Sequence, residues 1–367
     1  MTRREWLALI STAPLLRAAA PVAPVSIAKC ASYDDDVTAK LGTMFDQLGG
    51  LGRLVRNKTV TIKLNMTGGP GNRLRGLAPA MTHYVHPKVI NATAYHLSRA
   101  GAKRIRFVES AWATTGPLED VMLESGWKVR EMLAVAPGIE FENTNGLGKR
   151  KQYARFKAPA NAYMYPEYVL NEAYRDTDVF VSLAKLKEHA DCGITLSLKN
   201  CFGIVPASIY GDDAGIDEPN ESPTKGRSEV VHRARRQPAR IAPPELFPGV
   251  GPKTASYRVS RVVADLAVAR PIDLAIVDGI ESMAGGEGPW IRGTRPVKPG
   301  VMLAGLNPVT LDTVGAAVMG HDPRAFKPAS DNTLLLAEAH GVGAADLSRI
   351  EVHGVSIADA MFKYATA

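Results

Sequence analysis

The strongest constraint on the fold is a strand, a helix and a second strand that follow one another between residues 59 and 108. Residues 59–64 (TVTIKL) form a β-branched, alternating run that is typical of a strand. Residues 88–100 carry apolar side chains at helical spacing up to Gly101, and residues 104–108 again favour a strand. Strand, helix and strand in this order predict the opening of a parallel α/β sheet.

The same alternation continues along the chain. Further strands are expected at 178–183, 272–277, 301–306 and 349–353, with helices at 257–269, 308–320 and 330–340. The strands at 178–183 and 272–277 are almost continuously apolar, which suits a sheet that is covered on both faces. The 367 residues are 46% hydrophobic and 22% charged, a normal globular composition. We therefore predict an α/β fold: one large domain with a mostly parallel sheet and helices on both faces.

A long polar segment interrupts this pattern at residues 206–253. It is dense in proline, glycine and charge, has no sustained period, and includes a cluster of arginines at positions 233, 235, 236 and 240. Loops longer than about 15 residues are usually functional or flexible. The segment is interpreted as a surface insertion or a lid over the site, and a disordered excursion is the alternative.

The first residues resemble a twin-arginine signal peptide. Arg3 and Arg4 precede an apolar run at 6–16 and small residues through Ala28. The expectation is a signal at 1–28 and a mature domain at 29–367, exported by the twin-arginine (Tat) translocase to the periplasm or outside the cell. The apolar run is shorter than the about 20 residues of a spanning helix, so no stable membrane anchor is expected. A basic amphipathic first helix of a cytoplasmic protein is the alternative.

Charge and cysteine content narrow the ligand classes. The formal net charge of +7 suits an anionic small molecule or surface, but no arginine-rich stripe with interleaved aromatic residues suggests nucleic acid. The three cysteines, Cys30, Cys192 and Cys201, include no Cys-x-x-Cys spacing, so an iron–sulfur cluster is not expected. Whether Cys192 and Cys201 form a disulfide is left open.

Cationic and amide side chains follow the predicted strands, where ligands bind in doubly wound sheets. They are Lys63 and Asn65 after the first strand, Lys185, Lys187 and His189 along one face beyond 178–183, and Thr195, Lys199 and Asn200 shortly after. Together they would bind a carboxylate or phosphate, and Lys185 and His189 are candidates for proton transfer. The alternative is a solvated strand end.

The strand at 272–277 ends on a second group of candidates. Asp278 is a third candidate for catalysis, and Gly285, Gly286 and Gly288 could present backbone N–H groups to an anion. A divalent metal is also considered, because carboxylates suit magnesium or manganese and histidine adds iron or zinc. Its ligands would be Asp278, Glu287, Asp312 and His189. Asp312 alternatively interacts with the positive end of the helix that begins at Pro308.

These blocks resemble the family catalogued as domain of unknown function 362. The resemblance rests on Lys63-x-Asn65, Lys185-x-Lys187-x-His189 with Thr195 and Lys199-Asn200, Asp278-Gly279 to Gly288-Pro289, and Asn307-Pro308-Val309 with Asp312. Many members of that family resemble cluster-carrying proteins with a ferredoxin-like segment, and many have twin-arginine signals. This chain lacks the ferredoxin cysteines. The resemblance supports the fold and the site candidates and implies no particular reaction.

The functional expectation is an exported enzyme that acts on an anionic small molecule at the carboxyl edge of the sheet, with or without a metal. Two alternatives remain from other classes. One is an extracytoplasmic protein that binds such a ligand without turnover, and the other is an accessory factor for an exported redox enzyme. A titrating group within about 3 Å of a ligand's reactive atom would distinguish an enzyme from both.

Overall fold

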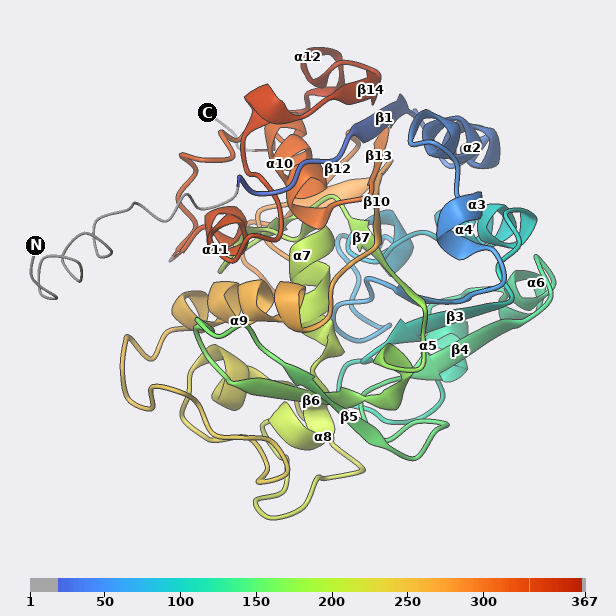
Figure 1. The fold of residues 1–367 in the computed structure, drawn as a ribbon. Coiled ribbons are helices and arrows are strands. Elements are labelled where there is room, and N and C mark those ends of the chain that lie inside the picture. The colour runs from blue at the N-terminus through green and yellow to red at the C-terminus, as the bar shows by residue number, and fades with distance from the viewer. Residues whose placement is uncertain (1–18, 330, 365–367) are drawn as a thin grey trace, which may run out of the picture.

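The computed structural model describes residues 19–329 and 331–364 and shows a central sheet between two layers of helices (Figure 1). The sheet has eight strands in the order β14-β1-β13-β10-β7-β2-β3-β4. Their bounds are β1 Val25–Lys29, β2 Thr59–Lys63, β3 Arg104–Glu109, β4 Ile139–Asn143, β7 Val179–Lys185, β10 Leu274–Gly279, β13 Val301–Gly305 and β14 Val352–Gly354. The predicted mostly parallel α/β fold is confirmed.

Strand direction and order locate a ligand-binding edge. Strands β4, β3, β2, β7 and β10 are parallel, β13 runs against both β10 and β1, and β14 is parallel to β1. From β2 the chain builds outward through β3 to β4, and it then returns to the other side of β2 as β7. The order therefore reverses between β2 and β7. Such a switch point leaves a crevice at the carboxyl ends of the strands.

Helices cover both faces because the strands alternate their side chains. On one face Val181 and Leu183 pack in a core with α2 and α4, and on the other Phe180 and Ala184 pack with α7, α9, α10 and α11. The helices of the two layers are α2 Val37–Gln47, α4 Pro87–Arg99, α7 Leu196–Asn200, α9 Ala255–Ala269, α10 Pro308–Val318 and α11 Thr333–Ala339. Asn307 caps α10 by accepting from the N–H groups of Val309 and Thr310, as its place before Pro308 suggests.

Shorter elements complete the fold. The remaining strands form three small hairpins: β5 Tyr153–Lys157 with β6 Glu167–Asn171, β8 Glu188–His189 with β9 Gly193–Ile194, and β11 Ser282–Ala284 with β12 Arg295–Val297. Short helices are α3 Gly52–Val55, α5 Leu118–Glu124, α6 Val129–Leu133, α8 Ala207–Tyr210 and α12 Ile357–Ala360. Single turns lie at Pro79–Met81, Glu172–Tyr174, Cys201–Ile204 and Leu347–Arg349, and a π-helical turn at Ser228–His232.

The folded domain begins earlier than residue 29. Val25–Lys29 forms β1, which lies inside the sheet and pairs with β13 on one side and β14 on the other. The boundary expected after residue 28 therefore falls within a strand. The two arginines of the predicted signal lie in residues 1–18, outside the described residues. No helix in the described part of the chain is both long and apolar enough to cross a membrane.

The segment 206–253 is folded against the domain although its sequence has no period. Val230, Val231 and Ala239 are buried, and Glu245 forms a buried ion pair with Arg258 of α9 at 2.6 Å. These contacts give the segment a fixed place beside α9. Its movement as a lid stays a prediction. Cys30, Cys192 and Cys201 are buried free thiols. Cys192 and Cys201, whose pairing the sequence left open, therefore do not form a disulfide in this structure.

Candidate functional site

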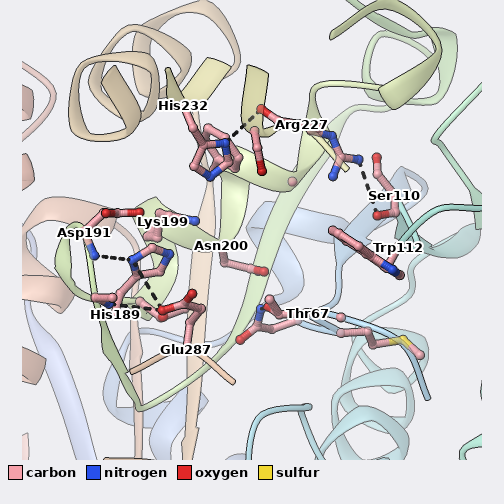
Figure 2. A pocket seen from close by; sticks show the side chains of 18 of the residues that line it. Thr67, Ser110, Trp112, His189, Asp191, Lys199, Asn200, Arg227, His232 and Glu287 are labelled. Atoms are coloured by element: carbon pink, nitrogen blue, oxygen red, sulfur yellow. Dashed lines mark hydrogen bonds and ion pairs between the residues drawn. The ribbon is translucent and has the colours of Figure 1, made fainter. Parts of the chain in front are cut away.

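A pocket of about 690 Å³ opens at the carboxyl edge of the sheet, where the strand order reverses (Figure 2). This volume is in the range of small-molecule sites. The sequence candidates that line it are Lys63, Asn65, His189, Thr195, Lys199, Asn200 and Glu287. The structure thus brings together residues that follow β2 and β7 and one from the glycine-rich loop, which lie far apart in the sequence.

The floor of the pocket is a buried ion pair at the ends of β2 and β3. Lys63 Nζ lies 2.5 Å from Glu109 Oε1, and Glu109 also accepts the backbone N–H of Met66. Asn200 fixes this arrangement, because its amide nitrogen donates to the Lys63 carbonyl and to Ser182. Asn65 differs from these neighbours. Its buried Oδ1 has no hydrogen-bond partner among the described residues, so it can accept a bond from a ligand.

Lys199 is the one sequence candidate whose charged group is left for a ligand. It lies near the end of α7 with Nζ 4.4 Å from the centre of the Phe202 ring, and no hydrogen bond or ion pair joins it to the rest of the described chain. Burial lowers its pKa, while the carboxylates of Glu287 and Asp191 act in the opposite direction. Figure 2 shows its amino group in the pocket, close to the two histidines.

Two histidines flank Lys199, and both are held neutral. His189 Nδ1 accepts from the backbone N–H of Asp191 at 3.0 Å, which assigns the proton of the neutral ring to Nε2. Burial, reinforced by Lys199, lowers the His189 pKa well below its usual value. His232 Nδ1 donates to the Arg227 carbonyl at 2.9 Å, so its Nε2 is free to accept. The pair therefore offers one donor and one acceptor at neutral pH.

Another part of the wall comes from Arg227 of the polar insertion, which also carries His232, and from the loop after β3. Arg227 donates to the carbonyl of Val205 and to Asn145 Oδ1, and it reaches Ser110 O at 3.5 Å. These contacts fix the guanidinium at the pocket, where it faces Ser110 and Trp112 in Figure 2. The insertion therefore contributes a cation to the site.

Lys185 and Asp278 form a separate, fully buried pair outside the pocket. Lys185 Nζ lies 3.0 Å from Asp278 Oδ2 and 2.7 Å from the hydroxyl of Tyr33, which itself donates to Asp278. Lys63 is in register with Ser182, whereas Lys185 lies three residues further along β7. Because side chains alternate between the faces of a strand, Lys185 points away from the face that carries Lys63. These two candidates are consequently not at the pocket.

Lys187 and the glycine-rich loop support the pocket from behind. Lys187 Nζ donates to the carbonyls of His83 and Glu287, and burial lowers its pKa to about 7. The N–H of Gly285 donates to Glu188 and is not available to an anion. Gly285, Gly286 and Gly288 do not line the pocket, whereas the Glu287 side chain does. The loop therefore contributes a carboxylate to the wall and no anion-binding cup at Gly285.

The four metal candidates do not converge. Asp312 accepts from the backbone N–H groups of Ser197 and Leu198 at the start of α7, and burial raises its pKa to about 7. His189 Nδ1 and Glu287 Oε2 are 3.9 Å apart, and Asp278 is bound to Lys185. No group of three metal-ligating side chains occurs in residues 19–329 and 331–364. The predicted ligand set is not assembled in this structure.

Comparison with known proteins places this site in a family. Residues 60–317 match the family model described as Domain of unknown function (DUF362). The chain belongs to this family. It is also 27% identical over 190 residues to the thylakoid-associated protein sll1697 of Synechocystis sp., an alignment that covers 51% of this chain and 52% of the relative. The chain thus matches about half the length of that relative.

The match to DUF362 contains the whole pocket, because the lining residues lie between Lys63 and Ile291. Strands β1 and β14 lie outside it. Charged and aromatic residues of this DUF362 pocket that were absent from the sequence candidates include Glu109, Trp112, Arg227, His232 and Trp290. Glu109 follows the predicted strand 104–108 directly, so the rule that found Lys63 would also have found it. Trp112, Arg227 and Trp290 lie in irregular segments and His232 in a single π-helical turn, and the sequence pattern predicts the course of neither.

The partly buried His232 predicts a measurable acid sensitivity of this DUF362 member. Burial lowers its pKa to about 4 from an ordinary value near 6.5. The unfolded chain therefore takes up the proton first, and the free energy of unfolding decreases as the pH falls from about 6.5 to about 4. We expect His232→Asn, whose amide can still donate to Arg227, to reduce this decrease by at most about 3 kcal/mol. Urea titrations at several pH values test this, and equal slopes for both proteins would contradict it.

Proposed function

We propose that this protein is an enzyme that binds an anionic small molecule in the pocket and transfers a proton with Lys199 or His189. The single observation that carries the proposal is Lys199, a lysine with no hydrogen bond or ion pair to the described residues, which faces a pocket of ligand size. An ammonium that is partly buried and has no partner is unfavourable. A ligand anion would supply the missing partner.

The surrounding charges favour an anion over a cation. The Lys63 ammonium is already paired with Glu109, so the cations left for a ligand are Lys199 and Arg227, with Arg233 at the edge of the pocket. Arg227 donates to the protein through Nε and Nη2, and its Nη1 makes no hydrogen bond to the described residues. Two separated cations match a carboxylate or phosphate group.

Proton transfer is supported by the lowered pKa values on the same wall. Burial makes Lys199 easier to deprotonate, and it keeps His189 neutral with its proton on Nε2. The Lys199 ammonium can then donate its proton to a negative charge that develops on the bound molecule, and the His189 Nε2–H donates a hydrogen bond to the same charge.

Untargeted mass spectrometry of a cell extract tests the proposal. The purified protein and its Lys199→Met variant are incubated separately with the same extract of anionic metabolites, and all compounds are compared before and after. We expect one or more anions to be consumed by the wild-type protein and not by the variant. An anion that is retained without conversion would instead identify a binding protein. An extract that neither protein alters or depletes would contradict the proposal.

We also propose export of the chain by the twin-arginine pathway to the periplasm or beyond. Because β1 is an internal strand, we expect the signal to be removed before Val25, where Ala18-Ala19-Ala20 provides the small residues that signal peptidase requires. N-terminal sequencing of the exported protein measures this boundary. Replacing Arg3 and Arg4 with lysine should retain the precursor in the cytoplasm. Export of that variant would contradict the twin-arginine pathway. A mature chain that begins after Lys29 would contradict cleavage before Val25.

A further inference from the structure

Two tryptophans stand at the pocket with half of their surface exposed. Trp112 is 52% exposed and Trp290 is 47% exposed, and both line the pocket. By contrast Trp127 is buried in the core at 5% exposure. Large aromatic side chains left in contact with water beside a cavity mark a contact surface, because their faces gain free energy when a ligand covers them.

Glycines hold both indole rings in place. A β-carbon at Gly68 would lie 2.4 Å from the Trp290 ring, and one at Gly288 would lie 2.1 Å from it. Gly226 has the same relation to Trp112, at 2.5 Å. Only a residue without a side chain lets the backbone approach a ring this closely. The rings are thus seated against the main chain and are not loose on the surface.

Both rings also lie against the same short segment of the chain. Trp290 packs on Gly68, and a β-carbon on the next residue, Gly69, would lie 3.9 Å from the Trp112 ring. A hydrogen bond of 3.3 Å from Trp290 Nε1 to Glu287 further fixes the orientation of the indole. We call Trp112 and Trp290 the aromatic entrance of the pocket. The cationic side chains of Lys199 and Arg227 line the same pocket.

From this arrangement we propose that the ligand is an anion that carries a flat ring system. The ring stacks on the aromatic entrance while the anionic group reaches Lys199 and Arg227. This inference rests on the proposed function for its anion site and adds the chemical class of the rest of the ligand. A pocket of about 690 Å³ has room for both parts.

Adenosine monophosphate and ribose 5-phosphate are a matched pair of probes. They share the phosphate and the sugar, and they differ by the flat base. Losing the stacking of a base on an aromatic side chain typically weakens the affinity by about ten- to a hundredfold. We expect adenosine monophosphate to bind the wild-type protein at least about tenfold more tightly than ribose 5-phosphate in calorimetric titrations.

Variants of the two tryptophans test whether the aromatic entrance causes this difference in affinity. Trp112→Ala and Trp290→Ala should each reduce the advantage of adenosine monophosphate by about fivefold or more and leave ribose 5-phosphate unchanged, and Trp290→Phe should restore part of it. Tyr95→Ala is the control, because Tyr95 is an exposed aromatic residue on α4 that does not line the pocket.

The outcomes separate the two proposals. Equal affinity for both compounds, with binding lost in Lys199→Met, would overturn the ring inference and leave the anion site standing. An advantage of adenosine monophosphate that persists in both tryptophan variants would also overturn the ring inference. Failure of both compounds to bind at millimolar concentrations would contradict the anion site and the ring inference together.

Discussion

Replacing Lys185 by methionine is expected to lower the free energy of unfolding by about 3–5 kcal/mol at pH 7. Both members of the Lys185–Asp278 pair are completely buried at 3.0 Å. Methionine fills the space of the lysine, yet it leaves the Asp278 carboxylate without its cation in a site of low polarity. The Tyr33 hydroxyl and the His86 N–H remain as donors to Asp278 and limit the loss. Urea denaturation of the purified variant measures it.

An exposed pair of nearly equal length provides the control. Lys128 Nζ lies 3.1 Å from Glu131 Oε1, and the two side chains are 76% and 67% exposed. Exposed pairs of this kind contribute about 0–1 kcal/mol, so Lys128→Met should have little effect. The double variant Lys185→Met/Asp278→Asn should recover much of the loss, because it removes both charges. A Lys185→Met protein as stable as Lys128→Met would contradict the burial argument.

The alternation of side chains along one strand predicted the edge of the sheet where the site lies. It did not predict which of the polar residues at that edge face the pocket. The pattern of 178–183 placed Lys185, Lys187 and His189 in one row, whereas the structure ends the strand at Lys185 and turns the chain into the β8–β9 hairpin. Lys63 and Lys185 occupy opposite faces because of the register of β2 with β7. That register depends on contacts between residues more than a hundred positions apart, and periodicity within a single strand contains no information about it.

Where strong local patterns exist, the sequence predicts the fold closely. The predicted helix 88–100 is α4 Pro87–Arg99, and the predicted strand 104–108 is β3 Arg104–Glu109. Strand β1 was missed because its small and apolar residues also suit the end of a signal peptide. Arg227 and Trp290 were missed for another reason. Their segments gain their conformation from packing against the domain, and a one-dimensional pattern does not show such contacts.

Lys199→Met is expected to weaken ligand binding and to leave the stability of the protein almost unchanged, whereas Lys185→Met is expected to lower the stability. The Lys199 ammonium lies over the Phe202 ring and makes no hydrogen bond or ion pair to the described residues, and its partly exposed side chain faces the pocket. Methionine keeps the packing on Phe202 and removes a cation that burial disfavours. The free energy of unfolding at pH 7 should stay within about 0.5 kcal/mol of the wild-type value or increase.

Ligand affinity should respond strongly to the same change. A charge-assisted hydrogen bond contributes about 1.5–3 kcal/mol, which corresponds to a ten- to hundredfold loss of affinity for ribose 5-phosphate in Lys199→Met. Calorimetric titration gives the affinity, and urea denaturation of the unliganded protein gives the stability. Lys128→Met should change neither quantity, since Lys128 is exposed and lies outside the pocket. A variant that binds as tightly as the wild type would exclude Lys199 from the site. A variant that loses several kcal/mol of stability would mean that the ammonium group holds the fold together, as Lys185 does.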